Sequence, residues 1–263
     1  MKYKNIVHTT GIGDFLAIDA YFTDAEKEKI ENIYFINDIG KQNNIKNIIK
    51  KSLKYNSNIN FISLHDNYLD YWNHRREILY KNKINFNSTL IDFEFIWGNE
   101  EYKQTKNLKN YFFLKNNIAN IKKFDLPEKY CIVISYTNPE RHFDKRDWQQ
   151  TLQIIKFLNI KAVILGQIDK LNFNNKNIIN LNKKTSIPEA IEIVKNSSYY
   201  LGIDSFLSIV ATSCLTNNKI QIKTKNKNAL ENFSFYYPFQ KDINIIRHNI
   251  NFKYFIRNFY KLL

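Results

Sequence analysis

The chain has 263 residues, of which 44% are hydrophobic and 15% are aromatic. This length suffices for one large domain or two small ones with separate cores, and the composition excludes an intrinsically disordered chain. The formal net charge of +14 favours anionic partners. The basic residues are spread along a chain rich in Lys, Asn and Ile and form no block typical of a nucleic-acid-binding arm. Nucleic acid is therefore the less favoured partner.

Neither a membrane span nor a metal site is expected. No apolar run approaches the roughly 18 residues that cross a bilayer, and the first residues lack the pattern of a signal peptide. We therefore expect a cytoplasmic protein. The two cysteines, Cys131 and Cys214, lie in apolar stretches. We interpret them as small buried hydrophobic residues, because two distant cysteines form neither a metal cluster nor a disulfide framework.

Short apolar runs alternate with amphipathic stretches, which is typical of an α/β fold. The first series predicts strands over 5–8, 32–36, 58–64 and 89–96 and helices over 13–22, 41–53 and 72–80. A second series begins after Pro127 and predicts strands over 130–136, 162–165, 177–181, 199–203, 220–223 and 243–247 and helices over 146–158, 188–195, 206–214 and 251–263. The restart predicts two Rossmann-like domains, residues 1–127 and 128–263, with a cleft between them.

The first segment that suggests a binding site is a glycine turn. Gly11 and Gly13 follow the strand over 5–8 and precede Asp14. Glycines let a backbone approach a ligand closely, and a helix N-terminus stabilises a carboxylate in its first turn. An ordinary β–α turn with an acidic residue at the start of its helix fits the same residues.

A second polar segment follows the strand over 130–136. In open α/β sheets, ligands bind at the carboxyl ends of the strands. Hydroxyl groups that donate hydrogen bonds, together with the planar guanidinium of arginine, suit a diphosphate. We interpret Trp148, in the helix that follows, as a packing residue. The polar side chains of this segment are Ser135, Thr137, Arg141, His142 and Lys145.

A third segment places Asp204 and Ser205 between the strand over 199–203 and the next helix. The amides at a helix N-terminus form a natural phosphate or ribose site. Asp and Ser are also the preferred N-cap residues, so simple capping of the helix is the alternative interpretation.

Together these segments resemble the heptosyltransferase family of GT-B glycosyltransferases. The resemblance covers residues 130–224 and the first 20. It rests on five stretches in the family's order: 11–14 (Gly-Ile-Gly-Asp), 141–148 (an Arg, Phe and Trp pattern), 163–166 (a strand ending in Gly), 184–189 (Lys-Thr-Ser-Ile-Pro-Glu) and 202–211 (Gly-Ile-Asp-Ser at its start).

The resemblance implies a GT-B-like fold of two Rossmann-like domains facing a central cleft. Residues 1–127 would form the acceptor side and residues 128–263 the nucleotide-sugar donor domain. Whether the final helix packs back on the N-terminal domain stays open. The implied reaction is an inverting, metal-independent transfer from a nucleotide-diphosphate sugar to a glycan or glycolipid acceptor of the lipopolysaccharide or capsule type. No further cofactor is implied. Peripheral association with the inner face of the membrane is compatible with such an acceptor.

The resemblance also assigns residues to roles. Asp14, after Gly11 and Gly13, would be the catalytic base. The donor-binding set would be Ser135, Thr137, Arg141, His142, Lys145, Gly166, Thr185, Asp204 and Ser205.

Two departures from the family pattern leave alternatives open. Phe206 stands where the family has Gly, and Ile209 stands where it has a His expected to face the donor phosphates. A catalytically inactive nucleotide- or glycan-binding protein therefore remains an alternative. An enzyme that glycosylates a nucleic-acid base is another, which the net charge slightly favours.

Overall fold

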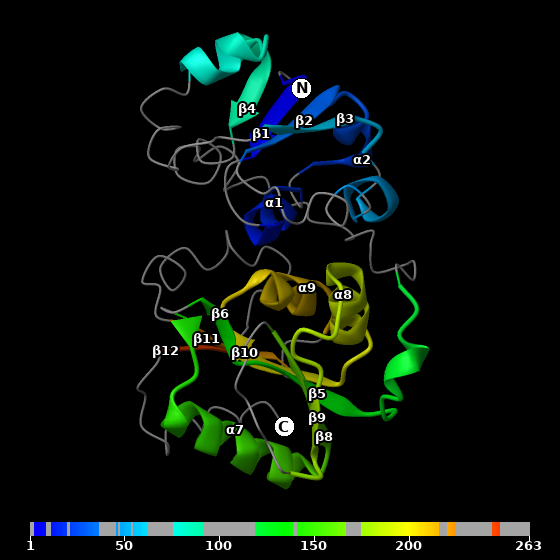
Figure 1. Cartoon of the computed structure of the whole chain (residues 1–263), viewed down its shortest axis with the longest axis vertical. Coiled ribbons are helices and arrows are strands. Elements are labelled where there is room, and N and C mark those ends of the chain that lie inside the picture. The colour runs from blue at the N-terminus through cyan, green and yellow to red at the C-terminus, as the bar shows by residue number, and fades with distance from the viewer. Residues whose placement is uncertain are drawn as a thin grey trace. The chain divides into compact units, whose positions relative to one another are not determined.

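The computed structural model describes residues 3–8, 12–19, 22–36, 46, 48–53, 55–62, 76–91, 119–138, 141–166, 175–215, 220–224 and 244–247. The chain divides into two compact units, Met1–Asn116 and Asn117–Leu263, and each holds its own parallel sheet (Figure 1). The α/β class predicted from the sequence is confirmed. The assignment of residues 1–127 to the acceptor and 128–263 to the donor stays a prediction.

The N-terminal sheet has the order β3-β2-β1-β4, and all its strands are parallel. Its strands are β1 (Asn5–His8), β2 (Asn32–Ile36), β3 (Asn58–Ile62) and β4 (Thr89–Ile91). The helical elements around it are α1 (Ile12–Asp19), α2 (Asp24–Lys27), the π-helix η1 (Ile48–Ser52), the 3-10 helix η2 (Phe86–Ser88) and residues 76–81. The predicted strand ends over 63–64 and 92–96 and the helix start over 41–45 lie outside the described residues.

The predicted helix over 13–22 ends early, because a second helix begins just beyond it. Helix α1 stops at Asp19, and Thr23 is the N-cap of α2. The Thr23 hydroxyl accepts a hydrogen bond from the Glu26 amide, and the Glu26 carboxylate accepts one from the Thr23 amide. This reciprocal capping box favours a new helix start at Thr23 over continuation of α1.

Side chains that alternate along the strands fill apolar layers on both faces of the N-terminal sheet. On one face, Phe15 of α1 packs edge-on against His8, with ring centroids 5.2 Å apart, and lies 5.3 Å from the Phe35 ring. On the other face, Val7 and Ile36 belong to one buried cluster with Leu79, Ile84 and Ile91. Because both faces are covered, all four residues of β1 are buried and β2 is apolar after its first residue.

An asparagine ladder fixes the register of this sheet. Asn5, Asn32 and Asn58 are the first residues of three adjacent strands and lie directly beside one another. The side-chain NH₂ group of Asn32 donates to the Asn5 side-chain oxygen at 2.9 Å. The side-chain NH₂ group of Asn58 donates to the Asn32 side-chain oxygen at 3.4 Å. A slip of one residue would break these bonds and turn the apolar side chains to the wrong face.

A buried ion pair joins the ends of α1 and α2. The Lys27 ammonium lies 2.8 and 2.9 Å from the two carboxylate oxygens of Asp19, and the two side chains are only 7% and 3% exposed. The ammonium also lies 5.3 Å from the centre of the Tyr55 ring. This contact anchors α1, the helix that carries Asp14.

Lys27→Met should destabilise the N-terminal unit by about 3–5 kcal/mol, because it leaves the Asp19 carboxylate buried without a counter-charge. Urea unfolding measures the effect. The exposed Lys29→Met is the matched control and should change stability by less than about 0.5 kcal/mol. Replacing both partners, with Asp19→Leu added to Lys27→Met, should recover much of the loss. Equal stability of the Lys27 and Lys29 variants would contradict a structural role for the pair.

The C-terminal sheet has the order β12-β11-β10-β5-β8-β9, and its six strands are parallel. The chain starts in the middle with β5, builds outward to β9, and returns to lay β10, β11 and β12 on the other side of β5. Connections therefore leave the neighbouring strands β5 and β10 in opposite directions. The strands are β5 (Tyr130–Ile134), β8 (Lys161–Leu165), β9 (Ile178–Asn180), β10 (Tyr199–Ile203), β11 (Ile220–Thr224) and β12 (Asn244–Arg247).

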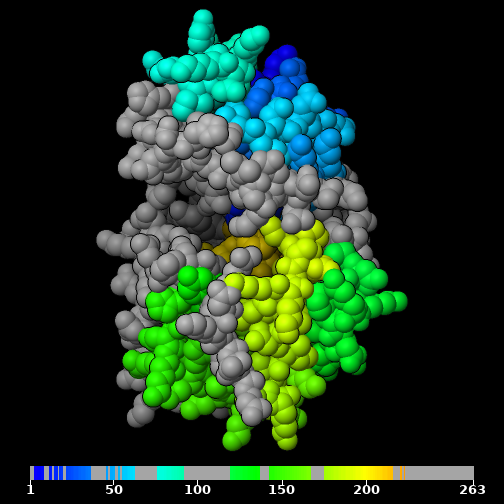
Figure 2. All heavy atoms as spheres, viewed as in Figure 1, coloured from blue at the N-terminus to red at the C-terminus, as the bar shows by residue number. Residues whose placement is uncertain are grey.

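Helices cover both faces of this sheet. Figure 1 shows α7 (Lys145–Leu158) on one face and α8 (Ile187–Lys195) and α9 (Phe206–Cys214) on the other. The space-filling view shows the yellow-green residues of β9 and α8 as a band on the surface of this unit (Figure 2). Helix α7 starts one residue earlier than predicted, because Asp144 caps it and accepts a hydrogen bond from the Asp147 amide at 2.8 Å. The predicted final helix over 251–263 lies outside the described residues.

The predicted strand over 130–136 was wrong at its end. Strand β5 stops at Ile134, and β6 (Tyr136–Asn138) pairs antiparallel with β7 (Arg141–His142), with an irregularity between Tyr136 and Asn138. The Ser135 carbonyl accepts a hydrogen bond from the Phe143 amide at 2.8 Å. This bond draws the chain out of the main sheet, so the segment expected to be a loop is largely a small hairpin.

Candidate functional site

The polar residues predicted after β5 and β10 are brought together at one edge of the C-terminal sheet. Strands β5 and β10 are parallel neighbours, with Ile134 paired to Gly202, so Ser135 and Ile203 follow at the same level. The crevice outside the carboxyl ends of two such strands, where the strand order reverses, is the usual ligand site of a doubly wound sheet.

Ser135 is the most informative residue at this edge. It is 1% exposed, and its hydroxyl oxygen has no hydrogen-bond partner among the residues that the structure describes. More than nine-tenths of buried polar groups in folded proteins are paired, so an orphaned hydroxyl at a ligand edge suggests a missing partner. Ser135 directly follows Ile134, the last residue of β5.

The N-terminus of α9 points from the same edge. Ser205 is the N-cap residue and pairs with Ser208 in a capping box. The Ser205 amide donates to the Ser208 hydroxyl at 3.0 Å, and the Ser205 hydroxyl lies 3.4 Å from that of Tyr200. Asp204 is half-buried beside it. The half-buried Ser205 side chain thus lies at the start of the helix, on the edge where a ligand is expected.

Tyr200 supports the turn between β10 and α9 from within the protein core. Its ring is fully buried, and its hydroxyl lies 3.2 Å from the Ile203 carbonyl, which accepts the hydrogen bond. Burial raises the pKa of Tyr200 well above its usual value, so the phenol stays protonated and remains a donor. A Cβ on Gly202 would lie 2.9 Å from the Tyr200 hydroxyl and 3.0 Å from Cβ of Ile134. Glycine at 202 is therefore required for β10 to pack beside β5.

Gly166 and Asn182 lie at the same edge, beyond β8 and β9. Gly166 has φ +142°, a conformation that favours glycine. A Cβ there would meet the Asn182 side-chain oxygen at 3.2 Å and the Tyr136 carbonyl at 3.4 Å. Asn182 is 9% exposed, and neither atom of its amide group has a partner among the described residues. Sequence reasoning singled out Gly166 and missed Asn182.

Thr185 precedes the N-terminus of α8. It is half-buried, and the next residue, Ser186, caps the helix through a capping box with Glu189. Burial alone would raise the pKa of Glu189, but hydrogen bonds from Lys123 and Ser186 outweigh it and lower that pKa. The Lys123–Glu189 ion pair also ties η4 (Lys122–Phe124) to α8. This helix start is satisfied internally.

The remaining predicted donor residues lie on or just after the β6–β7 hairpin. Thr137 and Arg141 are in β6 and β7, and their side chains are outside the described part of the structure. His142, in β7, pairs with Tyr136 and is exposed. Lys145 is the exposed first residue of α7. Their roles stay predictions.

Trp148 is a packing residue, as expected. It lies edge-on to the buried Phe143 ring, with ring centroids 5.5 Å apart. Phe143 follows β7 directly, so this contact packs the hairpin against α7.

The position of Asp14 agrees with the prediction, although its side chain is not described. It is the third residue of α1, directly after β1. Gly13 lies inside the first turn of the helix, and Gly11 lies outside the described residues. A base at this place stays a prediction.

The two departures from the family pattern differ in exposure. Ile209 is 5% exposed and packs in α9, whereas Phe206 is half-buried in the first turn. An apolar side chain at position 209 offers no hydrogen bond to a phosphate.

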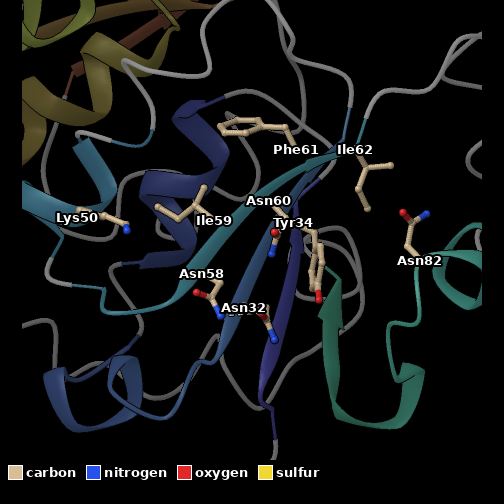
Figure 3. A pocket seen from close by; sticks show the side chains of 9 residues that line it. All are labelled: Asn32, Tyr34, Lys50, Asn58, Ile59, Asn60, Phe61, Ile62 and Asn82. Carbon is tan, nitrogen blue, oxygen red and sulfur yellow. Dashed lines mark hydrogen bonds between the residues drawn. The ribbon is translucent and has the colours of Figure 1, made fainter.

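The N-terminal unit carries a separate open hollow over β2 and β3 (Figure 3). Its lining is rich in side-chain amides and includes one tyrosine, and none of the predicted site residues belongs to it. The lining residues are Asn32, Tyr34, Lys50, Asn58, Ile59, Asn60, Phe61, Ile62 and Asn82.

Within the described part of the chain, no three His, Cys, Asp or Glu side chains gather to hold a metal. No described helix combines the length and apolar character needed to span a bilayer. Cys131 is a free, buried thiol, in agreement with its interpretation as a small hydrophobic residue. Burial raises the pKa of the half-buried Cys214 to about 12, so neither thiol is an activated nucleophile.

Comparisons with solved structures agree with the fold described above. The chain is similar to a glycosyl transferase of family 9 from Veillonella parvula, with TM-score 0.55 and 13% identity over 99% of this chain and 90% of that chain. It is similar to E. coli heptosyltransferase WaaC with ADP, with TM-score 0.57 and 9% identity over 98% of this chain and 100% of that chain. It is also similar to E. coli ADP-heptose LPS heptosyltransferase II, with TM-score 0.59 and 11% identity over 98% of each chain.

No protein-family model and no curated protein matches the sequence. At such low identities the structural matches show the fold alone. The heptosyltransferase-like fold predicted from the sequence is therefore confirmed, while activity and substrates rest on the site residues.

Gly202→Ala should lower the free energy of unfolding of the C-terminal unit by about 1–3 kcal/mol, because the added methyl group overpacks the Tyr200–Ile134 contact. Thermal unfolding followed by circular dichroism measures this. Gly13→Ala, at a half-buried helical position, is the comparison and should be neutral or slightly stabilising. A Gly202→Ala protein as stable as the parent would show that the β5–β10 junction tolerates a side chain there.

Proposed function

We propose that the protein is a glycosyltransferase that transfers a sugar from a nucleotide-diphosphate sugar to a glycan or glycolipid acceptor. The observation that carries the proposal is the orphaned hydroxyl of Ser135 beside the N-terminus of α9, at the reversal of strand order in the C-terminal sheet. The phosphate oxygens of a nucleoside diphosphate would accept hydrogen bonds from the donor groups at this edge.

The donor diphosphate would lie across the carboxyl ends of β5 and β10. Ser135 and Ser205 would donate hydrogen bonds to its oxygens, and Arg141 would neutralise its charge with a bidentate contact. The amides at the start of α9 would add a favourable dipole. These donors also stabilise the charge that develops on the diphosphate as it leaves.

The transfer would be inverting and would require no metal ion. Asp14 would accept the proton of an acceptor hydroxyl. The hydroxyl oxygen then bonds to the anomeric carbon as the bond from that carbon to the diphosphate oxygen breaks, and the electron pair leaves with the nucleoside diphosphate. The first turn of a helix favours a carboxylate in its ionised form, which is the form that a base requires. Within this class, the similarity in fold to an E. coli ADP-heptose LPS heptosyltransferase supports an acceptor of the lipopolysaccharide type.

A catalytically inactive nucleotide-binding protein is the second candidate. The observation that favours it is Ile209, a buried apolar residue at the place where the resemblance expects a phosphate-facing His. Such a protein would keep the donor contacts of Ser135 and Ser205 but would not transfer sugar. Turnover therefore separates the two candidates, whereas nucleotide binding does not.

Ser135→Ala should weaken nucleoside-diphosphate binding by about 10–100-fold without loss of stability. The variant removes a hydroxyl that has no partner in the free protein but would contact a charged phosphate in the complex. Ser197→Ala is the matched control: its buried hydroxyl donates to the Val194 carbonyl at 2.7 Å. It should lose about 1 kcal/mol of stability and keep nucleotide affinity. Titration calorimetry and thermal unfolding give both values. Unchanged affinity of the Ser135 variant would remove this residue from the donor site.

Asp14→Asn should lower sugar transfer by roughly 10²–10⁴-fold while donor affinity stays intact, since the amide cannot accept the proton. Release of nucleoside diphosphate from a panel of nucleotide sugars, with glycolipid acceptors present, measures turnover. Asp24→Asn, at the exposed start of α2, is the control and should keep full activity. Near-normal turnover of the Asp14 variant would mean that this residue only stabilises its helix. A parent protein that binds nucleotide but turns over no donor would favour the second candidate.

A further inference from the structure

Two orphaned polar side chains flank a glycine in one row of the C-terminal sheet. Hydrogen bonds from the Leu181 amide to the Ile164 carbonyl and from the Lys183 amide to the Gly166 carbonyl, both 3.0 Å, continue the β8–β9 ladder. Gly166 therefore lies beside Asn182. On its other side, Ile134 pairs with Leu165, so Ser135 follows beside Gly166. The row of Ser135, Gly166 and Asn182 thus follows the ends of three adjacent strands. Neighbouring strands in a sheet lie about 4.8 Å apart.

The middle residue of this row has no side chain, and its surroundings are close. A Cβ at position 166 would come within 3.2 Å of the Asn182 side-chain oxygen and 3.4 Å of the Tyr136 carbonyl. The side-chain amide of Asn182 thus lies against Gly166, at a position that disfavours a larger residue.

Asn182 is buried and held in a fixed position, as a binding residue would be. It is nine-tenths buried, and its backbone amide is fixed by a hydrogen bond to the Asn180 side-chain oxygen at 3.0 Å. Its own side-chain donor and acceptor both lack partners within the described chain. Two unsatisfied polar atoms in a single buried side chain carry a large desolvation penalty unless a ligand pairs with them.

We propose that the Asn182 amide reads the nucleobase of the donor and determines which nucleotide the protein accepts. The inference rests on the proposed function, which places a nucleoside diphosphate at this edge. With the diphosphate held near Ser135 and Ser205, the missing side chain at Gly166 lets a base approach the backbone, and Asn182 is the next residue along the row.

The chemistry of the amide favours a base over the other parts of the donor. A phosphate only accepts hydrogen bonds, so it would satisfy the Asn182 NH₂ group and leave the side-chain oxygen unpaired. The edge of a base such as adenine presents a donor next to an acceptor, and a side-chain amide pairs with both at once.

Asn182→Leu tests the assignment, because it keeps the size of the side chain and removes both hydrogen-bonding atoms. The full chain is titrated with ADP, UDP, GDP and CDP, with one matching nucleotide sugar, and with pyrophosphate as the base-free probe. The parent should prefer one base. The Leu variant should bind that nucleotide about 10–100-fold more weakly, should lose most discrimination among the four, and should bind pyrophosphate within twofold of the parent.

Two further variants complete the design. Asn177→Ala, in an exposed position at the other end of the same strand, should bind like the parent. If leucine fits poorly at this position, Asn182→Ala repeats the test. Thermal unfolding of each variant shows whether it is folded. Because the side-chain amide of Asn182 pairs with none of the described residues, neither Asn182 variant should be markedly less stable than the parent.

The outcomes separate this inference from the function on which it rests. Unchanged base discrimination in both Asn182 variants overturns the inference and leaves the donor site intact. An equal loss for pyrophosphate assigns the amide to the phosphates, and a loss confined to the nucleotide sugar assigns it to the sugar, so either result also overturns it. A parent protein that binds no nucleoside diphosphate overturns the proposed function and the inference together.

Discussion

The parallel pairing of β5 with β10 is the constraint on which the candidate site depends. These strands are far apart in sequence, yet Ile134 lies beside Gly202 because the chain lays two strands, β8 and β9, on one side of β5 before it returns to the other. The connections after the two strands diverge, so their carboxyl ends border a common crevice. Gly202 makes the close approach feasible, since Tyr200 and Ile134 occupy the space where its side chain would lie.

Buried polar groups without a described partner lie at this edge of the C-terminal sheet, where Ser135 and Asn182 contribute three such atoms. Ser205 lies at the start of α9 on the same edge, and its hydroxyl lies 3.4 Å from that of Tyr200. Helices α7 and α8 begin with capping boxes, in which Asp144 and Ser186 satisfy the helix amides. A protein selected for stability alone would pair or replace the orphaned groups, and a polar ligand at this edge would pair them.

Much of this fold could be predicted from the sequence because buried parallel strands have a distinct pattern. The strands over 5–8, 32–36 and 199–203 are short apolar runs bounded by polar residues, and their ends agree with the structure. The β6–β7 hairpin was missed because its pairing, Tyr136 with His142 and Asn138 with Arg141, follows no apolar pattern. The early end of α1 depends on the capping box at Thr23, which is visible in the sequence but competes with a continuing helix.

The site was predictable in part for the same reason. Ser135 and Ser205 follow strands whose carboxyl ends were recognisable, and the rule that ligands bind there led to both. Asn182 also follows a predicted strand, but an asparagine in a polar turn is usually exposed, and only its burial and its lack of partners set it apart. Those properties depend on packing between β8 and β9, which no local pattern encodes.

A crystal structure of the full chain grown with a nucleoside diphosphate tests the central claim most directly. We expect the diphosphate to lie over the carboxyl ends of β5 and β10, with its oxygens within hydrogen-bond distance of the Ser135 hydroxyl and the start of α9. A nucleotide bound elsewhere, or crystals that take up none at millimolar concentration while Ser135 remains unpaired, would contradict it.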